Sequence, residues 1–350
     1  MEAEEYQKRE MIAYEAFIRR ASMINSPFML KGSYVTRQYF QYPGDRIPAD
    51  LDWVYMHKIS SHIVANELFS DWVTSITELD LDDCVTSRSF RENDFWRMID
   101  YAMADDFPTV NTDLKCWVDE TVVDLHVDIS FNLDIEQPPV SLEYRPVRGE
   151  GFIIPNTVPL SLQVSWKIHQ TLVRPRFKDL YDLTHLVNHS AFDQQELAKS
   201  FQALLNECKT DNVDLSKLRS FLTYDIAFLF PDNTLEETWE YWRHGRLDGQ
   251  YNGRPILYFD KAILITKSNS LPFDLSTFLN NFRQAMEQKG WTLDLIKDLN
   301  IPPVIKQPPV SDPVDTEVKK TKRVEEEVDI LDEATKSISF WERIKRMIRK

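Results

Sequence analysis

Two aspartates, Asp50 and Asp52, have the spacing in this sequence that most directly suggests chemistry. They enter a segment, 51–56, whose composition predicts a strand, and alternate residues of a strand point to the same side. Two like charges about 4 Å apart repel by about 4 kcal/mol at an effective dielectric of about 20. A divalent cation offsets that repulsion, and Mg²⁺ prefers oxygen ligands together with substrate phosphates. The pair therefore predicts a metal site.

A Gly-Ser pair follows another predicted strand, Phe28 to Leu30. Gly32 lets the backbone approach a triphosphate closely, and Ser33 offers a hydroxyl and an amide to its terminal phosphate. Asp128 offers a third carboxylate, on the polar face of an alternating segment, 121–131. Two metal ions held by three carboxylates bridge the attacking and leaving oxygens of an in-line displacement. Each feature alone is more often structural, but together and in this order they favour phosphoryl transfer.

Basic residues gather later in the chain, on two predicted helices, 160–173 and 177–187. The charged and aromatic residues of this group are Lys167, Arg174, Arg176, Lys178, Asp179, Tyr181 and Asp182. We expect Lys167 on a solvated helix face, where it neutralises the phosphates of an NTP. The alternative is that ion pairs within the group only tie the two helices together. That structural role is favoured for Tyr181, and a functional role for Lys167 and Asp179.

The acidic balance of the chain limits what it can bind. With 41 basic and 56 acidic residues the net charge is −15, so the surface as a whole repels phosphate backbones and only a local basic track suits RNA. Cys84, Cys116 and Cys208 are far apart and form no CxxC pair, so the sequence indicates neither a disulfide framework nor a thiolate zinc site. The charged start is not a secretory signal, and no apolar run approaches the ~20 residues of a membrane span. We expect a cytoplasmic protein.

The length of 350 residues and the 43% hydrophobic content predict two globular domains and a tail. Ser89 and Glu92 have capping-box spacing ahead of Phe95 and Trp96, which predicts a helix start. Residues 115–118 and 121–131 predict a hairpin around Asp119-Glu120. Further elements are helices at 8–24, 60–68, 195–230 and 278–288, and a strand pair at 255–266.

Proline dominates from Ile301 to Pro313 and predicts an extended linker. The end of the chain, Phe340 to Lys350, is basic and amphipathic. It has the pattern of a segment that binds a partner protein, lies on an anionic membrane or binds RNA. Packing back onto its own domain is an equal alternative, and membrane contact is the least favoured.

These motifs resemble those of the AbiEii/AbiGii nucleotidyltransferase toxins. The segment 28–33 (FMLKGS), Arg46 four residues before Asp50, and the Asp50-Leu51-Asp52 triplet are similar to the family's opening motifs. The segments 164–169 (VSWKIH) and 176–183 (RFKDLYDL) are similar to its later ones. The likeness covers roughly residues 10–190, and the last block is the most specific because it is long and compositionally unusual.

The resemblance implies an α+β (mixed α/β) fold with a DNA polymerase β-like nucleotidyltransferase core, a small mixed sheet and packed helices, over residues 1–190. A mainly helical C-terminal domain with a short strand pair would follow over 191–300, and the linker and tail over 301–350. It also implies Mg²⁺, with Mn²⁺ as the alternative, and an NTP donor. The implied acceptor is RNA, such as tRNA, and the implied partner is an antitoxin, as in toxin–antitoxin or phage-defence systems.

Motif position implies a role for each candidate residue. The candidate catalytic residues are Asp50, Asp52, Lys167 and Asp179. The candidate nucleotide-binding residues are Gly32, Ser33, Lys167 and Lys178. The candidate metal ligands are Asp50, Asp52 and Asp128, and the choice between Asp128 and Asp182 as the further site carboxylate stays open.

Two positions depart from the family pattern, which has Gly where this chain has Lys31 and Ser or Thr where it has Pro48. Neither departure removes a carboxylate, so we expect an active enzyme. The alternatives are a catalytically inactive relative that senses nucleotides or binds a protein, and transfer to a protein or small-molecule acceptor.

Overall fold

The computed structural model describes residues 3–48, 50–92, 95–98, 108–230, 234–244, 250–251, 254–255 and 271–299. Its strands are β1 (Phe28–Lys31), β2 (Leu51–Tyr55), β3 (Val85–Ser87), β4 (Arg97–Met98), β5 (Thr109–Val118), β6 (Thr121–Ser130), β7 (Val140–Tyr144), β8 (Phe152–Thr157), β9 (Gln250–Tyr251) and β10 (Arg254–Pro255). Its α-helices are α1 (Ala3–Met23), α2 (Ser33–Thr36), α3 (His62–Thr77), α4 (Leu160–Val173), α5 (Phe177–Asn188), α6 (Gln194–Thr210), α7 (Leu215–Leu222), α8 (Leu235–His244) and α9 (Leu275–Gln288).

The main sheet is mixed, as the predicted fold class requires. Its order is β3-β5-β6-β2-β1-β8-β7, with β4 pairing on β5. The pairs β2–β6 and β1–β8 are parallel and the others are antiparallel. Because β1 and β2 are antiparallel, the end of β1 lies against the start of β2, where Lys31 is paired with Asp52.

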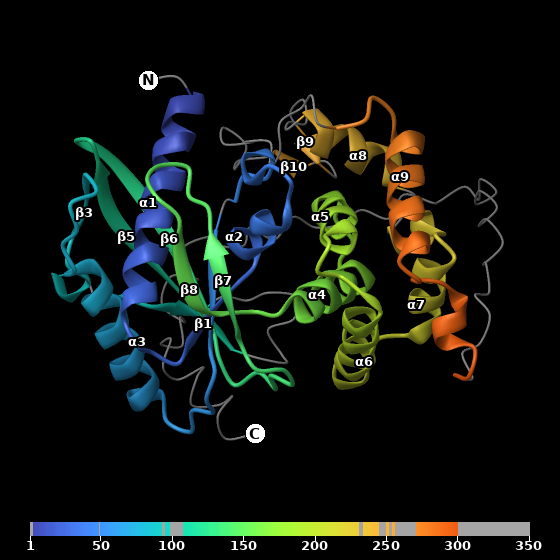
Figure 1. The fold of residues 1–350 in the computed structure, drawn as a ribbon, viewed down its shortest axis with the longest axis horizontal. Coiled ribbons are helices and arrows are strands. Elements are labelled where there is room, and N and C mark those ends of the chain that lie inside the picture. The colour runs from blue at the N-terminus through green and yellow to red at the C-terminus, as the bar shows by residue number, and fades with distance from the viewer. Residues whose placement is uncertain are drawn as a thin grey trace, which may run out of the picture.

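Helices α1 and α3 pack with the sheet, and α1 contacts β5, β6 and β8 (Figure 1). An aromatic core joins them to the central strands, in which the rings of Phe28 and Trp72 stack with centroids 3.9 Å apart. The apolar stripe of α3 continues through Trp72 and Ile76, both buried, so α3 is longer than the predicted helix 60–68.

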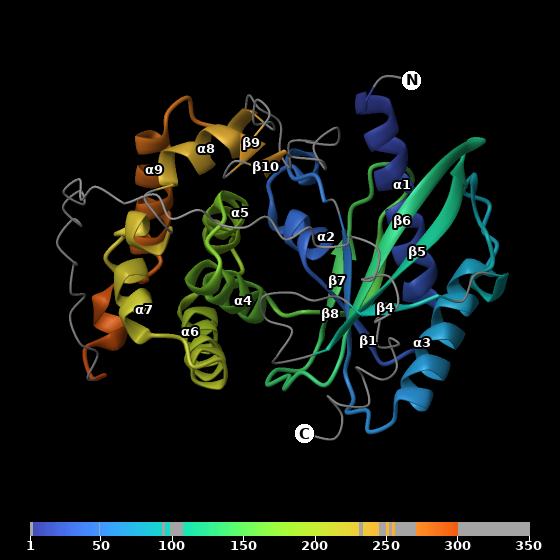
Figure 2. The same ribbon diagram turned by 180° about the vertical axis from the view of Figure 1, so that it is seen from behind.

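The helices that follow β8 gather on the other side of the molecule, with α2 between them and the sheet in both views (Figures 1 and 2). Helix α4 packs on α5 and α6, and α5 packs on α8 and α9. Aromatic rings of Phe177, Trp239, Trp242 and Phe278 contact one another and hold α5, α8 and α9 together. No helix among the described residues is both long and apolar enough to span a membrane.

Most predicted elements are present. The hairpin forms with a longer first arm, and α4 and α5 have the predicted positions. The helix predicted after Ser89 does not form at residues 95–98, and residues 93–94 and 99–107 of that stretch lie outside the described residues. The Ser89 hydroxyl donates to Glu78 Oε1 at 2.7 Å instead of capping a helix, and residues 97–98 pair with β5. The predicted strand pair 255–266 lies outside the described residues apart from Pro255, as do the linker and tail at 301–350.

Candidate active site

A cavity of about 310 Å³ lies where the β1–β2 end of the sheet faces α4, α5 and α6. From the sheet side it is lined by Lys31, Gly32, Ser33, Arg46, Asp50 and Asp52. From the helices it is lined by Gln163, Trp166, Lys167, Gln170, Arg174, Arg176, Lys178, Asp179, Asn206, Glu207, Thr210 and Asp211. The fold thus brings the predicted site residues to one cavity, except that neither Asp128 nor Asp182, the two candidates for the further carboxylate, lines it.

The predicted metal ligands lie on neighbouring strands. Asp50 directly precedes β2, and Asp52 on β2 is the register partner of Asp128 on β6. The pKa of Asp52 is raised to about 6, chiefly by burial and also by the charges of Asp50 and Asp128, although Lys31 opposes the rise. The raised pKa means that the charged form of Asp52 is disfavoured beside two other carboxylates. A bound cation would stabilise that charged form.

Asp128 is 5% exposed, and its Oδ1 accepts a hydrogen bond of 2.6 Å from Asn111 Nδ2. Asp182, the other carboxylate left open by the sequence, is fully buried and ion-paired with Arg46 and Lys167. The structure therefore places Asp128, and not Asp182, next to the aspartate pair.

The backbone conformation of Gly32 and the side chain next to it both require glycine at this position. Its φ is +76°, and a Cβ atom there would overlap the carboxylate of Asp52. The Gly32 carbonyl accepts hydrogen bonds from the Thr36 amide at 3.0 Å and from Gln163 Nε2 at 3.3 Å. These bonds fix the loop, and the missing side chain leaves room for the carboxylate.

Ser33 is 7% exposed, and its hydroxyl has no hydrogen-bond partner among the described residues. A buried hydroxyl without a partner costs free energy in the folded protein. Because Ser33 lines the cavity, a ligand oxygen that enters there would satisfy it.

Two buried carboxylates tie this region together: Asp182 joins the β1–β2 loop to α4, and Asp179 joins α4 to the start of α5. Asp182 accepts hydrogen bonds from Arg46 Nε at 2.7 Å, from Arg46 Nη2 at 3.2 Å and from Lys167 Nζ at 2.7 Å. Asp179 accepts one from Arg176 Nε at 2.6 Å and lies 3.4 Å from Lys167 Nζ. Burial alone would raise the pKa values of both aspartates, but these cations hold them below the usual range.

The prediction of a solvated Lys167 is wrong, because its side chain is only 13% exposed and contacts both aspartates. Tyr181 packs against Phe40 and His185, which agrees with the structural role favoured for it. Lys178 differs from Lys167. It lines the cavity and makes no hydrogen bond or ion pair with any described residue, and burial, followed by the charge of Arg176, lowers its pKa.

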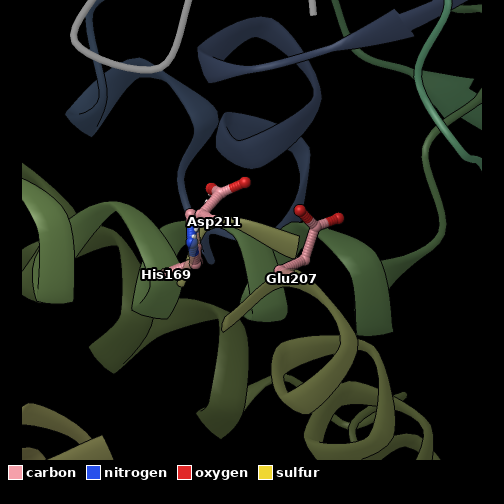
Figure 3. A group of neighbouring side chains, drawn as sticks. All are labelled: His169, Glu207 and Asp211. Carbon is pink, nitrogen blue, oxygen red and sulfur yellow. Dashed lines mark ion pairs between the residues drawn. The ribbon is translucent and has the colours of Figure 1, made fainter. Parts of the chain in front are cut away.

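One group of polar residues had no role in the sequence interpretation. His169 on α4, Glu207 on α6 and Asp211 at the end of α6 have ligand atoms that all lie within 4.8 Å of one another (Figure 3). The i and i+4 spacing of Glu207 and Asp211 on a helix is the only local signal. His169 joins them through the packing of α4 on α6, which the sequence does not display.

A model of the family described as nucleotidyl transferase AbiEii toxin of type IV toxin–antitoxin systems matches residues 24–262. Among solved structures, JHP933 from Helicobacter pylori is 14% identical with a TM-score of 0.39, over 85% of this chain and 99% of that chain. MenT4, a nucleotidyltransferase toxin from Mycobacterium tuberculosis H37Rv, is 11% identical with a TM-score of 0.47, over 85% of this chain and 87% of that chain. No curated protein matches the chain significantly. The family match spans more than half of the 350 residues and includes the whole cavity lining.

Proposed function

Because the chain belongs to the AbiEii nucleotidyl transferase toxin family, we propose that it moves a nucleoside monophosphate from an NTP onto RNA of tRNA type in a Mg²⁺-dependent reaction. The family inferred from the motifs is confirmed by the match over residues 24–262. The acceptor, the metal and an antitoxin partner are parts of the proposal.

One observation carries the proposal: Ser33 and Lys178, whose side chains have no hydrogen-bond or ion-pair partner among the described residues, line the same cavity as the carboxylates of Asp50 and Asp52. A triphosphate with its metal complements all of these groups. Its oxygens accept from the hydroxyl and the ammonium, and its cation neutralises the aspartates. An apolar ligand or a simple sugar would leave the charges uncompensated.

The donor set fits Mg²⁺, since it consists of carboxylate oxygens with room for substrate oxygens. Asp50 and Asp52 would hold the ion, and Asp128 is the carboxylate next to them on the neighbouring strand. Mg²⁺, when bound there, neutralises charge on the transferring phosphoryl group and on the leaving oxygen.

The residues of the chain position the donor. The Gly32 loop leaves space for the phosphates next to Asp52, and the Ser33 hydroxyl donates to a phosphate oxygen. Lys178 and Lys167 neutralise phosphate charge, and Lys167 is held in place by Asp182 and Asp179. An acceptor hydroxyl then attacks the α-phosphorus, the bond from that atom to the bridging oxygen breaks, and pyrophosphate leaves.

The cations of the cavity lining support a phosphate-bearing acceptor. Lys31, Arg174 and Arg176 line the cavity together with acidic residues, in a chain whose net charge is −15. These cations offer an RNA backbone local contacts that the acidic surface as a whole does not.

A second candidate, the catalytically inactive relative, is favoured by one contact. Lys31, where the family has Gly, places its Nζ 3.6 Å from Asp52 Oδ1 and so brings a cation to a predicted metal ligand. Substituting Lys31→Gly distinguishes the two candidates. If Lys31 replaces the metal, the wild type has no turnover and the variant gains it. If Lys31 only approaches the phosphates, the wild type is active.

The direct test incubates the protein with each α-³²P-labelled NTP, total cellular RNA and Mg²⁺. We expect label in RNA with at least one NTP, and none with the Asp50→Ala or Asp52→Ala variant. Label in protein or in a small molecule, with none in RNA, would overturn the proposed acceptor. No turnover with any NTP, restored by Lys31→Gly, would establish the inactive state.

A further inference from the structure

A second set of metal-ligating side chains lies at the helical wall of the cavity. His169 comes from α4, Glu207 from α6, and Asp211 is the residue at which α6 ends. Figure 3 shows His169 and Asp211 next to each other, with Glu207 on the same side of the helices. Asp50 and Asp52 belong to the sheet, so this cluster is a separate group of ligands.

The spacing of the cluster suits one metal ion. One ligand atom from each residue lies within 4.8 Å of the others, and His169 Nε2 is 2.9 Å from Asp211 Oδ2. Around an ion with bonds of about 2.1 Å, adjacent ligand atoms lie roughly 3–3.4 Å apart. The separation of the imidazole and the Asp211 carboxylate is just below this range, and a small rotation of Glu207 would complete the set.

A neighbouring tryptophan orients one of the candidate ligands. Trp166 Nε1 donates to Glu207 Oε1 at 3.0 Å, which orients the carboxylate. The candidate ligand set is one imidazole and two carboxylates.

We propose that His169, Glu207 and Asp211 bind a divalent transition-metal ion, Zn²⁺ or Mn²⁺, at a site distinct from Asp50 and Asp52. An imidazole suits these ions better than it suits Mg²⁺. Glu207 and Asp211 line the cavity while His169 is fully buried, so the coordination positions that the protein leaves open face the cavity. Three protein ligands with an open position are the arrangement of a metal that takes water or an anionic group of a bound molecule.

The competing explanation is that the His169–Asp211 ion pair only fastens α4 to the end of α6. The experiment uses the full chain carrying Asp50→Ala and Asp52→Ala, which removes the proposed catalytic metal site. The chain is stripped with chelator and titrated calorimetrically with Zn²⁺ and with Mn²⁺. Because binding is measured without NTP, the outcome is independent of the proposed transfer activity.

We expect one Zn²⁺ or Mn²⁺ per chain in this background. Glu207→Gln and Asp211→Asn change shape little, and each should weaken binding by at least about tenfold, since each removes a direct ligand. Asp214→Asn is the matched control, because it makes the same charge change three residues beyond Asp211. Asn still caps α7 in place of Asp214, so the control should bind as before. X-ray absorption of the Zn²⁺ form should show one imidazole nitrogen.

Circular dichroism confirms that each variant is folded before its affinity is compared. Two results would overturn the site: no stoichiometric Zn²⁺ or Mn²⁺ in the Asp50→Ala/Asp52→Ala chain, or equal affinity in the Glu207→Gln, Asp211→Asn and Asp214→Asn chains.

Discussion

Gly32 and Asp52 occupy adjoining space so closely that a Cβ atom on Gly32 would overlap the Asp52 carboxylate. The antiparallel register of β1 and β2 pairs Lys31 with Asp52, so the residue that follows Lys31 lies over that side chain. The proposed phosphate loop and the proposed metal ligand are therefore one structural unit, and a change in either moves the other.

Gly32→Ala should abolish transfer and destabilise the fold. The positive φ and the overlap with Asp52 together cost about 1–3 kcal/mol, and displacing a catalytic group by about 1 Å costs about 100-fold in rate. The measurements are kcat/KM for the NTP and thermal unfolding. Gly44→Ala is the control, since a Cβ at Gly44 meets nothing within 4 Å and should leave both unchanged. Equal activity in the two variants would contradict the proposed loop.

Local patterns in the sequence predicted the sheet side of the site. Strand alternation is a property of neighbouring residues, so the placement of Asp50 and Asp52 followed from spacing alone. The ion pair of Arg46 with Asp182 joins residues 136 positions apart, and the clustering of His169 with Asp211 depends on how α4 packs on α6. Such contacts depend on tertiary packing, so no local periodicity in the sequence predicts them.

A comparison of two helix-start patterns shows why a local signal can fail. Asp193 caps α6 because its carboxylate accepts from the amides of Gln195 and Glu196. Ser89 has the predicted spacing to Glu92, but its hydroxyl donates to Glu78, which comes from the end of α3. A partner brought in by tertiary packing replaced the local bond.

Ser33→Ala should weaken NTP use without destabilising the protein. The hydroxyl is buried and has no partner among the described residues, so its removal should leave the melting temperature unchanged or higher. A lost hydrogen bond to a charged phosphate, of about 1.5–3 kcal/mol, lowers kcat/KM by about 10- to 100-fold. Ser22→Ala, whose hydroxyl bonds the Arg19 carbonyl far along α1, should not change NTP kinetics. A fall in melting temperature with unchanged kinetics would show that Ser33 is structural.

Lys167→Ala and Lys178→Ala should separate stability from nucleotide binding. Removing Lys167 leaves Asp182 and Asp179 each with one cation fewer, so the free energy of unfolding should fall by about 1–3 kcal/mol. Lys178 has no partner among the described residues and a lowered pKa, so its loss should not destabilise the fold. Both variants should raise KM for the NTP.

Lys199→Ala is the control for this pair, because Lys199 is an exposed residue of α6 that lies outside the cavity lining. It should change neither KM nor the free energy of unfolding appreciably. If Lys178→Ala destabilises the protein more than Lys167→Ala does, the assigned contacts of the two lysines are wrong.

Asp182 should make the stability of the protein depend on pH below about pH 4. Burial alone would raise the pKa of Asp182, but Arg46 and then Lys167 hold it below the usual range. A folded-state pKa below the unfolded value near 3.9 contributes stability that is complete above that value and is lost as the pH falls. Asp182→Asn should therefore be less stable than the wild type at pH 7, and the difference should narrow by about 1 kcal/mol at pH 3. Urea unfolding at both pH values measures this, with Asp71→Asn, an exposed position on α3, as the control. A difference that stays constant from pH 7 to pH 3 would mean that the Arg46–Asp182–Lys167 contacts do not hold the charged form of Asp182.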